Sequence, residues 1–151
     1  MTANEVVAIY PELFESVLRE DSLESYGLGV GKGWHPLIAK LVREIREVDE
    51  ELGVKSRVAQ IKEKFGGLRF YLEETHTAHY EMISRAENAS YDTCEMCGRE
   101  GKMYNDGWMQ TLCRPHAQER WRNRAPRKAE LTWERCWRHD SVNNSEEAPK
   151  N

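Results

Sequence analysis

The chain has 151 residues, of which 39% are hydrophobic and 32% charged, and its formal net charge is −4. This length suits one domain, or one core with a small appended module, and excludes two large domains. No apolar run approaches the length of a membrane span and the first residues carry no basic leader, so we expect a soluble protein of the reducing cytoplasm.

Two short helical segments are predicted at the N-terminus, beginning near Asn4 and Pro11. The glycine-rich stretch 27–33 follows. We interpret it as a flexible connection, because it has neither the Gly-x-Gly-x-x-Gly spacing nor the Gly-Lys-Ser/Thr ending of phosphate-binding loops. A long helix should then begin near Pro36 and end at Gly53, with an apolar stripe made of Leu37, Leu41, Ile45, Val48 and Leu52.

Residues 57–73 form two alternating runs on either side of Gly66 and Gly67, which predicts a β-hairpin. We expect one face to be apolar, made of Ala59, Ile61, Leu68, Phe70 and Leu72. Because side chains alternate along a strand, the other face would then present Lys62, Arg69 and Tyr71. A helix is predicted over 77–89. The pair His76-x2-His79 lacks the Glu of a His-Glu-x-x-His zinc motif, so we interpret it as a surface pair at the start of this helix.

Four residues have the spacing of a structural metal site. Cys94-x2-Cys97 is followed after fifteen residues by Cys113-x2-His116. Three thiolates and one imidazole suit Zn²⁺ in a closed tetrahedron, and a closed tetrahedron leaves no open position for a substrate. The sequence therefore predicts one zinc ion with a structural role. Cys136-x2-His139 is a competing pair, which we interpret as buried residues of a helix, since one ion cannot take six ligands.

The elements around these ligands predict a treble-clef-like zinc module. Cys94–Gly98 reads as a knuckle, residues 102–112 as a hairpin around Asn105-Asp106-Gly107, and Pro115 opens a helix that carries His116. The fold class is therefore α+β: a helical and β-hairpin core at 1–90, the zinc module at 91–125, a C-terminal helix at 126–139 and a disordered tail at 140–151.

Two strings carry a resemblance to a known family. Gln60–Tyr71, with its Lys-Phe-Gly-Gly-Leu-Arg-Phe-Tyr core, and Cys94–Gly98, followed by Trp108 and Thr111-Leu112-Cys113, resemble small uncharacterised proteins of bacteriophages and prophages. The match extends from about Gly33 to His116. The resemblance implies a phage setting inside a bacterial host cell and carries no catalytic residue with it.

The charge distribution favours a binding function. Acidic residues dominate positions 1–30, whereas positions 114–138 hold eight Lys or Arg against three Glu. We expect binding of DNA or RNA, with phosphates or a partner contacted by Lys62, Arg69, Tyr71, Arg114, Arg120, Arg124, Arg127, Lys128 and Arg138. The same basic groups could instead form a solvated surface that balances the acidic half of the chain.

Two other functions stay open. A phage protein that binds and modulates a host protein would use Arg and Trp side chains as anchors. A nuclease built on a treble-clef core would need an exposed second metal site, for which His76, His79 and Asp106 are the available residues. Oligomeric state and the ligand's identity do not follow from the sequence.

Overall fold

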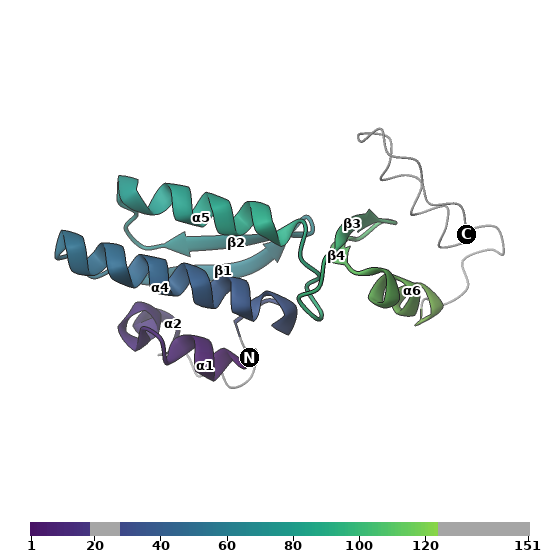
Figure 1. The fold of residues 1–151 in the computed structure, drawn as a ribbon, viewed down its shortest axis with the longest axis horizontal. Helices are drawn as coiled ribbons and strands as arrows, with labels where there is room; N and C mark the ends of the chain where they lie inside the picture. Colours follow the sequence, from purple (N-terminus) through teal and green to yellow (C-terminus); the bar gives the residue numbers. More distant parts are fainter. Residues whose placement is uncertain (19–27, 124–151) are drawn as a thin grey trace.

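The computed structural model describes residues 1–18 and 28–123, and these residues form a mixed α and β structure (Figure 1). The elements in chain order are α1 (Ala3–Val7), the short helix η1 (Pro11–Phe14), α2 (Glu15–Leu18), the short helix η2 (Lys32–Trp34), α4 (His35–Leu52), β1 (Val58–Lys64), β2 (Gly67–Leu72), α5 (Thr77–Ser90), β3 (Lys102–Asn105), β4 (Met109–Leu112) and α6 (Arg114–Asn123). The predicted α+β class is confirmed.

The main core lies between the two long helices, the β1–β2 hairpin and the N-terminal helices. In Figure 1, α4 and α5 run alongside each other and the hairpin, and α1 lies on the outer side of α4. Helix α2 packs against β1. The side chains of Phe14, Trp34 and Phe70 are the largest in this core and are fully or almost fully buried. The β3–β4 hairpin and α6 form the opposite end of the molecule from the α4–β1 loop.

Helix α4 ends as predicted, at Gly53 in the left-handed conformation (φ 65°). Its buried face, however, is turned from the predicted stripe. Leu41 and Ile45 are buried as expected, but the face also takes in Asp49, and Leu52 is exposed. The prediction followed apolar residues alone and so could not place a carboxylate in the core.

The β1–β2 hairpin is confirmed, but its turn is shifted by one residue. Lys64 pairs with Gly67, so Phe65 and Gly66 are the two loop residues, and both have positive φ (52° and 80°). Positive φ at both central residues defines a type I′ turn, whose twist matches the flanking strands. Ala59 does not point inward as predicted: the register is irregular between Val58 and Gln60, so Val58 is buried and Ala59 exposed.

Strand β2 is closed on its outer edge by α5. The hydroxyl of Ser90 accepts a hydrogen bond from the amide of Leu68 (2.8 Å), and a carboxylate oxygen of Glu87 accepts one from the amide of Phe70 (3.0 Å). Both amides point away from β1. Helix α5 therefore satisfies main-chain donors that no strand reaches.

The segment before α4 is not a flexible connection, as the sequence suggested, but a packed contact. An added Cβ at Gly33 would lie within 2.6 Å of three backbone atoms of the Cys94–Gly98 knuckle. The Gly33 amide donates to the Glu95 carbonyl (2.7 Å), and the Trp34 indole donates to the Thr93 carbonyl (2.8 Å). Glycine here allows two backbones to approach closely rather than allowing motion.

Several predictions lie outside the described residues. They are the helix at 126–139, the tail at 140–151, the pair Cys136 and His139, and the basic residues Arg124, Arg127, Lys128 and Arg138. None of the helices in the two described ranges combines the length and apolarity needed to cross a bilayer.

Candidate metal centre

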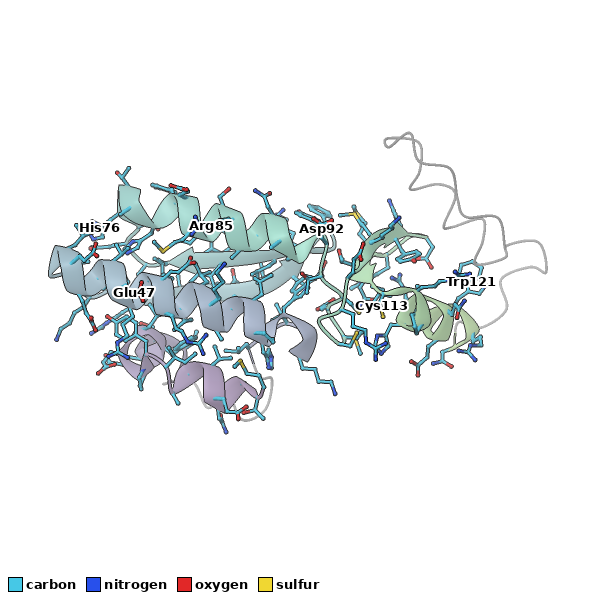
Figure 2. All side chains as sticks on the ribbon, viewed as in Figure 1. Glu47, His76, Arg85, Asp92, Cys113 and Trp121 are labelled. Carbon is cyan, nitrogen blue, oxygen red and sulfur yellow. The ribbon has the colours of Figure 1, made fainter. Side chains whose placement is uncertain are left out.

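The four residues predicted to bind metal converge on one point. The sulfurs of Cys94, Cys97 and Cys113 and a ring nitrogen of His116 all lie within 4.8 Å of one another. Cys97 Sγ is 3.6 Å from Cys113 Sγ, and His116 Nδ1 is 3.5 Å from Cys94 Sγ and 3.1 Å from Cys113 Sγ. Figure 2 shows Cys113 at the junction between the knuckle, the second hairpin and α6.

These separations fit a tetrahedral ion. Bond lengths of about 2.3 Å to sulfur and 2.0–2.1 Å to nitrogen give tetrahedral edges of about 3.8 Å between sulfurs and about 3.6 Å between sulfur and nitrogen. Two of the three separations lie within a few tenths of an ångström of these edges, and the third is about half an ångström shorter. The donor chemistry is also that of zinc, since thiolate and imidazole are its preferred ligands. The group is therefore positioned to hold a metal ion, through Nδ1 of the histidine.

Short-range backbone bonds shape the knuckle. The amide of Cys94 donates to the Arg99 carbonyl (2.7 Å), and the amide of Gly98 donates back to the Cys94 carbonyl (2.8 Å). Gly98 has a φ of 78°, a left-handed turn that a side chain would strain. Gly98 therefore turns the chain around the sulfurs, as expected of a knuckle.

Backbone amides also reach the sulfurs. The amide of Arg99 donates to Cys97 and the amide of His116 donates to Cys113. Burial acts to raise the pKa of Cys97, but the Arg99 amide and hydrogen bonds to the neighbouring thiols bring it below its ordinary value. Burial, reinforced by the other two cysteines, raises the pKa of Cys113 to about 11. A cation at the centre would stabilise all three thiolates at once.

The second hairpin and α6 hold the remaining ligands. Cys113 directly follows β4 and precedes α6, and Pro115 lies in the first turn of that helix, as predicted. Arg120 fastens the helix to the hairpin: its guanidinium donates to Asp106 Oδ1 (2.7 Å), to the Trp108 carbonyl (2.7 Å) and to Gln110 Oε1 (3.3 Å). Arg120, predicted to contact phosphates, is thus engaged within the module.

Glu95 joins the metal centre to the rest of the fold. Its side chain is buried, and its two carboxylate oxygens accept hydrogen bonds from the Gly31 amide (3.1 Å) and the Gln110 side chain (3.1 Å). Its amide donates to the Thr111 carbonyl (3.0 Å). The sequence offered no signal for this role, because a Glu between two cysteine ligands reads as an exposed residue.

The predicted hairpin surface lies where expected. Lys62 and Arg69 are cross-strand partners, as are Gln60 and Tyr71, on the side opposite the buried Leu68, Phe70 and Leu72. Arg69 is fixed by hydrogen bonds to the Tyr91 hydroxyl (3.0 Å) and the Leu68 carbonyl (2.8 Å). Arg114 lies at the start of α6, on the metal module. Five of the nine predicted binding residues are described, and they are divided between two places: Lys62, Arg69 and Tyr71 on the hairpin, and Arg114 and Arg120 on α6.

His79 is not the surface residue that the sequence suggested. It is fully buried; its Nδ1 faces the His76 amide (3.3 Å), and its Nε2 lies 3.0 Å from Asp49 Oδ1. Asp49 also accepts hydrogen bonds from the Tyr10 hydroxyl (3.0 Å) and from both the amide and the hydroxyl of Ser56 (2.9 and 2.8 Å). The donors of Tyr10, Ser56 and His79 are thus all paired with the Asp49 carboxylate. A buried polar cluster whose groups are paired in this way is typical of a structural role.

The three residues weighed for a nuclease site are separated. His76 caps the start of α5, at the end of the molecule where Figure 2 labels it, and His79 lies in the first turn of that helix. Asp106 lies between β3 and β4 and is paired with Arg120. Across residues 1–18 and 28–123, the Cys94–His116 group is the one cluster of three or more His, Cys, Asp or Glu side chains that is arranged to hold a metal.

Comparison of the chain with known family models, curated proteins and solved structures gives no match.

Proposed function

We propose that this chain is a phage-type, non-catalytic nucleic-acid-binding protein stabilised by one zinc ion. Cys94, Cys97, Cys113 and His116 would hold the ion in a treble-clef-like module of knuckle, hairpin and helix. The ligand set supports a structural role, because four protein ligands fill a tetrahedron and leave no position for a substrate. A bound ion would cross-link segments that are distant in the sequence and would take no part in a reaction.

The observation that carries the binding proposal is the outer surface of the first hairpin. We call it the hairpin face and define it as the outward side chains of Gln60, Lys62, Lys64, Arg69 and Tyr71 together with the turn residue Phe65. It opposes the buried side of the same two strands and combines three cations with two exposed rings. Positive charge interleaved with aromatic rings is the usual composition of protein surfaces that bind nucleic acid.

The two strands themselves contribute little opposing charge, although Glu87 of α5 acts on Arg69 from the edge of β2. Glu63 is the one acidic residue in the two strands, and it pairs with Leu68, which places it on the other side of the ribbon. Its carboxylate accepts a hydrogen bond from the Gly66 amide (2.6 Å). A chain whose net charge is −4 therefore has a locally positive surface.

The test measures metal and nucleic-acid affinity on the same sample. Elemental analysis of natively purified protein should give one zinc per chain. Affinity for a fluorescent oligonucleotide should fall linearly with salt on a log–log scale. Lys62→Gln should reduce the magnitude of that slope by about 1, which corresponds to the loss of one phosphate contact. The control Lys55→Gln, in the loop before β1, should leave the slope unchanged. Absence of zinc would refute the metal proposal, and absence of oligonucleotide binding at low salt would refute the binding proposal.

A protein partner of the bacterial host is the second candidate. Trp108, in the β3–β4 turn, is 63% exposed, and Met96, between the first two ligands, is 42% exposed. Trp and Met are enriched at protein interfaces, and hot spots there favour Trp. Binding to such a partner should change little with salt and should be lost in Trp108→Ala.

A further inference from the structure

The hairpin face has features that discriminate between nucleic-acid forms, and the inference drawn from them rests on the proposed function. A lysine ammonium group lies near each of its two exposed rings. The Lys62 ammonium lies 5.8 Å from the centre of the Tyr71 ring, and the Lys64 ammonium lies 5.5 Å from that of Phe65. A ring beside a cation offers one nucleotide both a stacking surface for its base and a charge for its phosphate.

Phe65 is held in an unfavourable backbone conformation. It has a φ of 52°, a region that bulky side chains avoid and that Asn or Gly adopts readily in this type of turn. Its ring is nevertheless 63% exposed, so burial in the core does not offset the strain. Strain retained without a packing benefit points to a role for the exposed ring.

The tip of the hairpin is blocked, which argues against insertion into a duplex. The Gly66 carbonyl accepts a buried hydrogen bond from the Thr111 hydroxyl (2.6 Å), and an added Cβ at Gly66 would lie 3.3–3.4 Å from Met103 and the Gln110 amide. The turn therefore rests on the second hairpin. A β-ribbon that reads the major groove must enter a channel about 8.5 Å deep, and a ribbon seated in this way does not project.

One cation on this face, Arg69, is also preorganised. Arg69 is clamped between the Leu68 carbonyl and the Tyr91 hydroxyl, with its guanidinium 6.0 Å from the centre of the Tyr91 ring. The Tyr91 hydrogen bond raises the pKa of Arg69, so its charge is constant. The Tyr91 ring packs against Gly67 on the same face, where an added Cβ would be 2.4 Å from the ring. Arg69, which lies between Tyr71 and the turn residue Phe65 along the ribbon, is therefore held in place.

We propose that the hairpin face binds single-stranded nucleic acid, with bases stacked on Tyr71 and Phe65 and phosphates contacted by Lys62, Lys64 and Arg69. A single strand presents unpaired base faces to such rings, whereas a duplex keeps its bases stacked on each other. Stacking on two rings with phosphate contacts between them reads no base edge, so the recognition is tolerant of sequence. DNA and RNA share this chemistry.

The test compares four ligands on the zinc-loaded full chain: a twelve-residue oligo-dT, the matching oligo-U, a DNA duplex and an RNA duplex, each labelled with fluorescein. We expect both single strands to bind at least tenfold more tightly than either duplex. Tyr71→Leu should lower single-strand affinity roughly tenfold or more. The matched control is Tyr80→Leu, on α5, where the side chain is 61% exposed and lies off the hairpin face.

A second variant separates a role in binding from a role in folding. Phe65→Asn creates the Asn-Gly sequence that this turn favours, so the melting temperature should stay equal or rise while single-strand affinity falls. Equal affinity for duplex and single strand, or full affinity in Tyr71→Leu and Phe65→Asn, would overturn the inference and leave the proposed function intact. Failure of all four ligands to bind would instead refute the proposed function.

Discussion

The contact between the glycine-rich segment and the metal knuckle makes Gly33→Ala the most informative substitution. The added Cβ would lie 2.2 Å from the Cys94 carbonyl oxygen, 2.5 Å from the Gly98 amide and 2.6 Å from the Cys97 amide. These are backbone atoms and cannot rotate away. Because carbon contacts are comfortable at about 3.5 Å, the knuckle must retreat from α4 by roughly 1 Å.

The cost has two parts. Overpacking of a well-packed contact costs about 1–3 kcal/mol, and losing the 2.7 Å hydrogen bond from Gly33 to Glu95 costs about 0.5–1.5 kcal/mol. Together they lower the free energy of unfolding by about 1.5–4.5 kcal/mol, or the melting temperature by roughly 3–18 °C for a chain of this size. The same displacement moves Cys94 and Cys97, so zinc affinity should fall about tenfold or more, since tenfold corresponds to about 1.4 kcal/mol.

Two measurements check this expectation: thermal unfolding of the zinc-loaded protein, and competition for zinc with a chromophoric chelator. The control is Gly53→Ala at the end of α4, where an added Cβ meets nothing within 4 Å but φ is 65°. It should cost about 1–2 kcal/mol through backbone strain alone and leave zinc affinity unchanged. If Gly33→Ala retained wild-type zinc affinity and melted no lower than this control, the reasoning would be wrong.

The remaining predictions concern the buried network around Asp49. Asp49→Ala leaves the donors of Tyr10, Ser56 and His79 buried without their acceptor, and it should lower the free energy of unfolding in urea by about 3–5 kcal/mol. The control, Glu47→Ala at an exposed position, should cost less than about 0.5 kcal/mol. Equal urea midpoints for the two variants would contradict the role of the network. Burial, with the hydrogen bond to Asp49, raises the pKa of Tyr10 to about 12 from its ordinary value of 10.0. The protonated hydroxyl therefore contributes stability that is complete below pH 10 and is lost as the pH rises towards 12, by roughly 1–2 kcal/mol, because the side chain is only partly buried and solvent screens its contact with Asp49. Tyr10→Phe should remove this pH dependence, and an unchanged profile would refute it.

The metal centre and the order of the elements could be predicted from the sequence because their signals are local. Ligand spacing, alternation along 57–73 and the turn signal at Asn105–Gly107 each act within a few residues. In the structure the ligands and the second turn appear at their predicted places, and the first hairpin appears with an error at Ala59 and in its turn. The turn of the first hairpin was misplaced by one residue because two adjacent glycines both suit positive φ. The register that pairs Lys64 with Gly67 selects the first of them.

The contacts between distant segments could not be predicted. Gly33 has no side chain, so nothing in its sequence context distinguishes a packed glycine from a flexible one. Asp49 and His79 are polar residues on otherwise amphipathic helices, and a pattern of apolar residues assigns them to the surface. Their burial depends on partners thirty or more positions away, such as Tyr10, and only the folded chain brings these partners together.

The closure of β2 by Ser90 and Glu87 has a consequence for how the protein associates. A two-stranded sheet is marginal by itself, and an open strand edge invites pairing with another chain. Here two side chains of a helix occupy the positions where a third strand would bond, so neither a second copy nor an extended peptide can extend the sheet on that side. Strand addition at β2 is therefore blocked, while the exposed rings of Phe65 and Tyr71 stay accessible on the broad surface of the same ribbon.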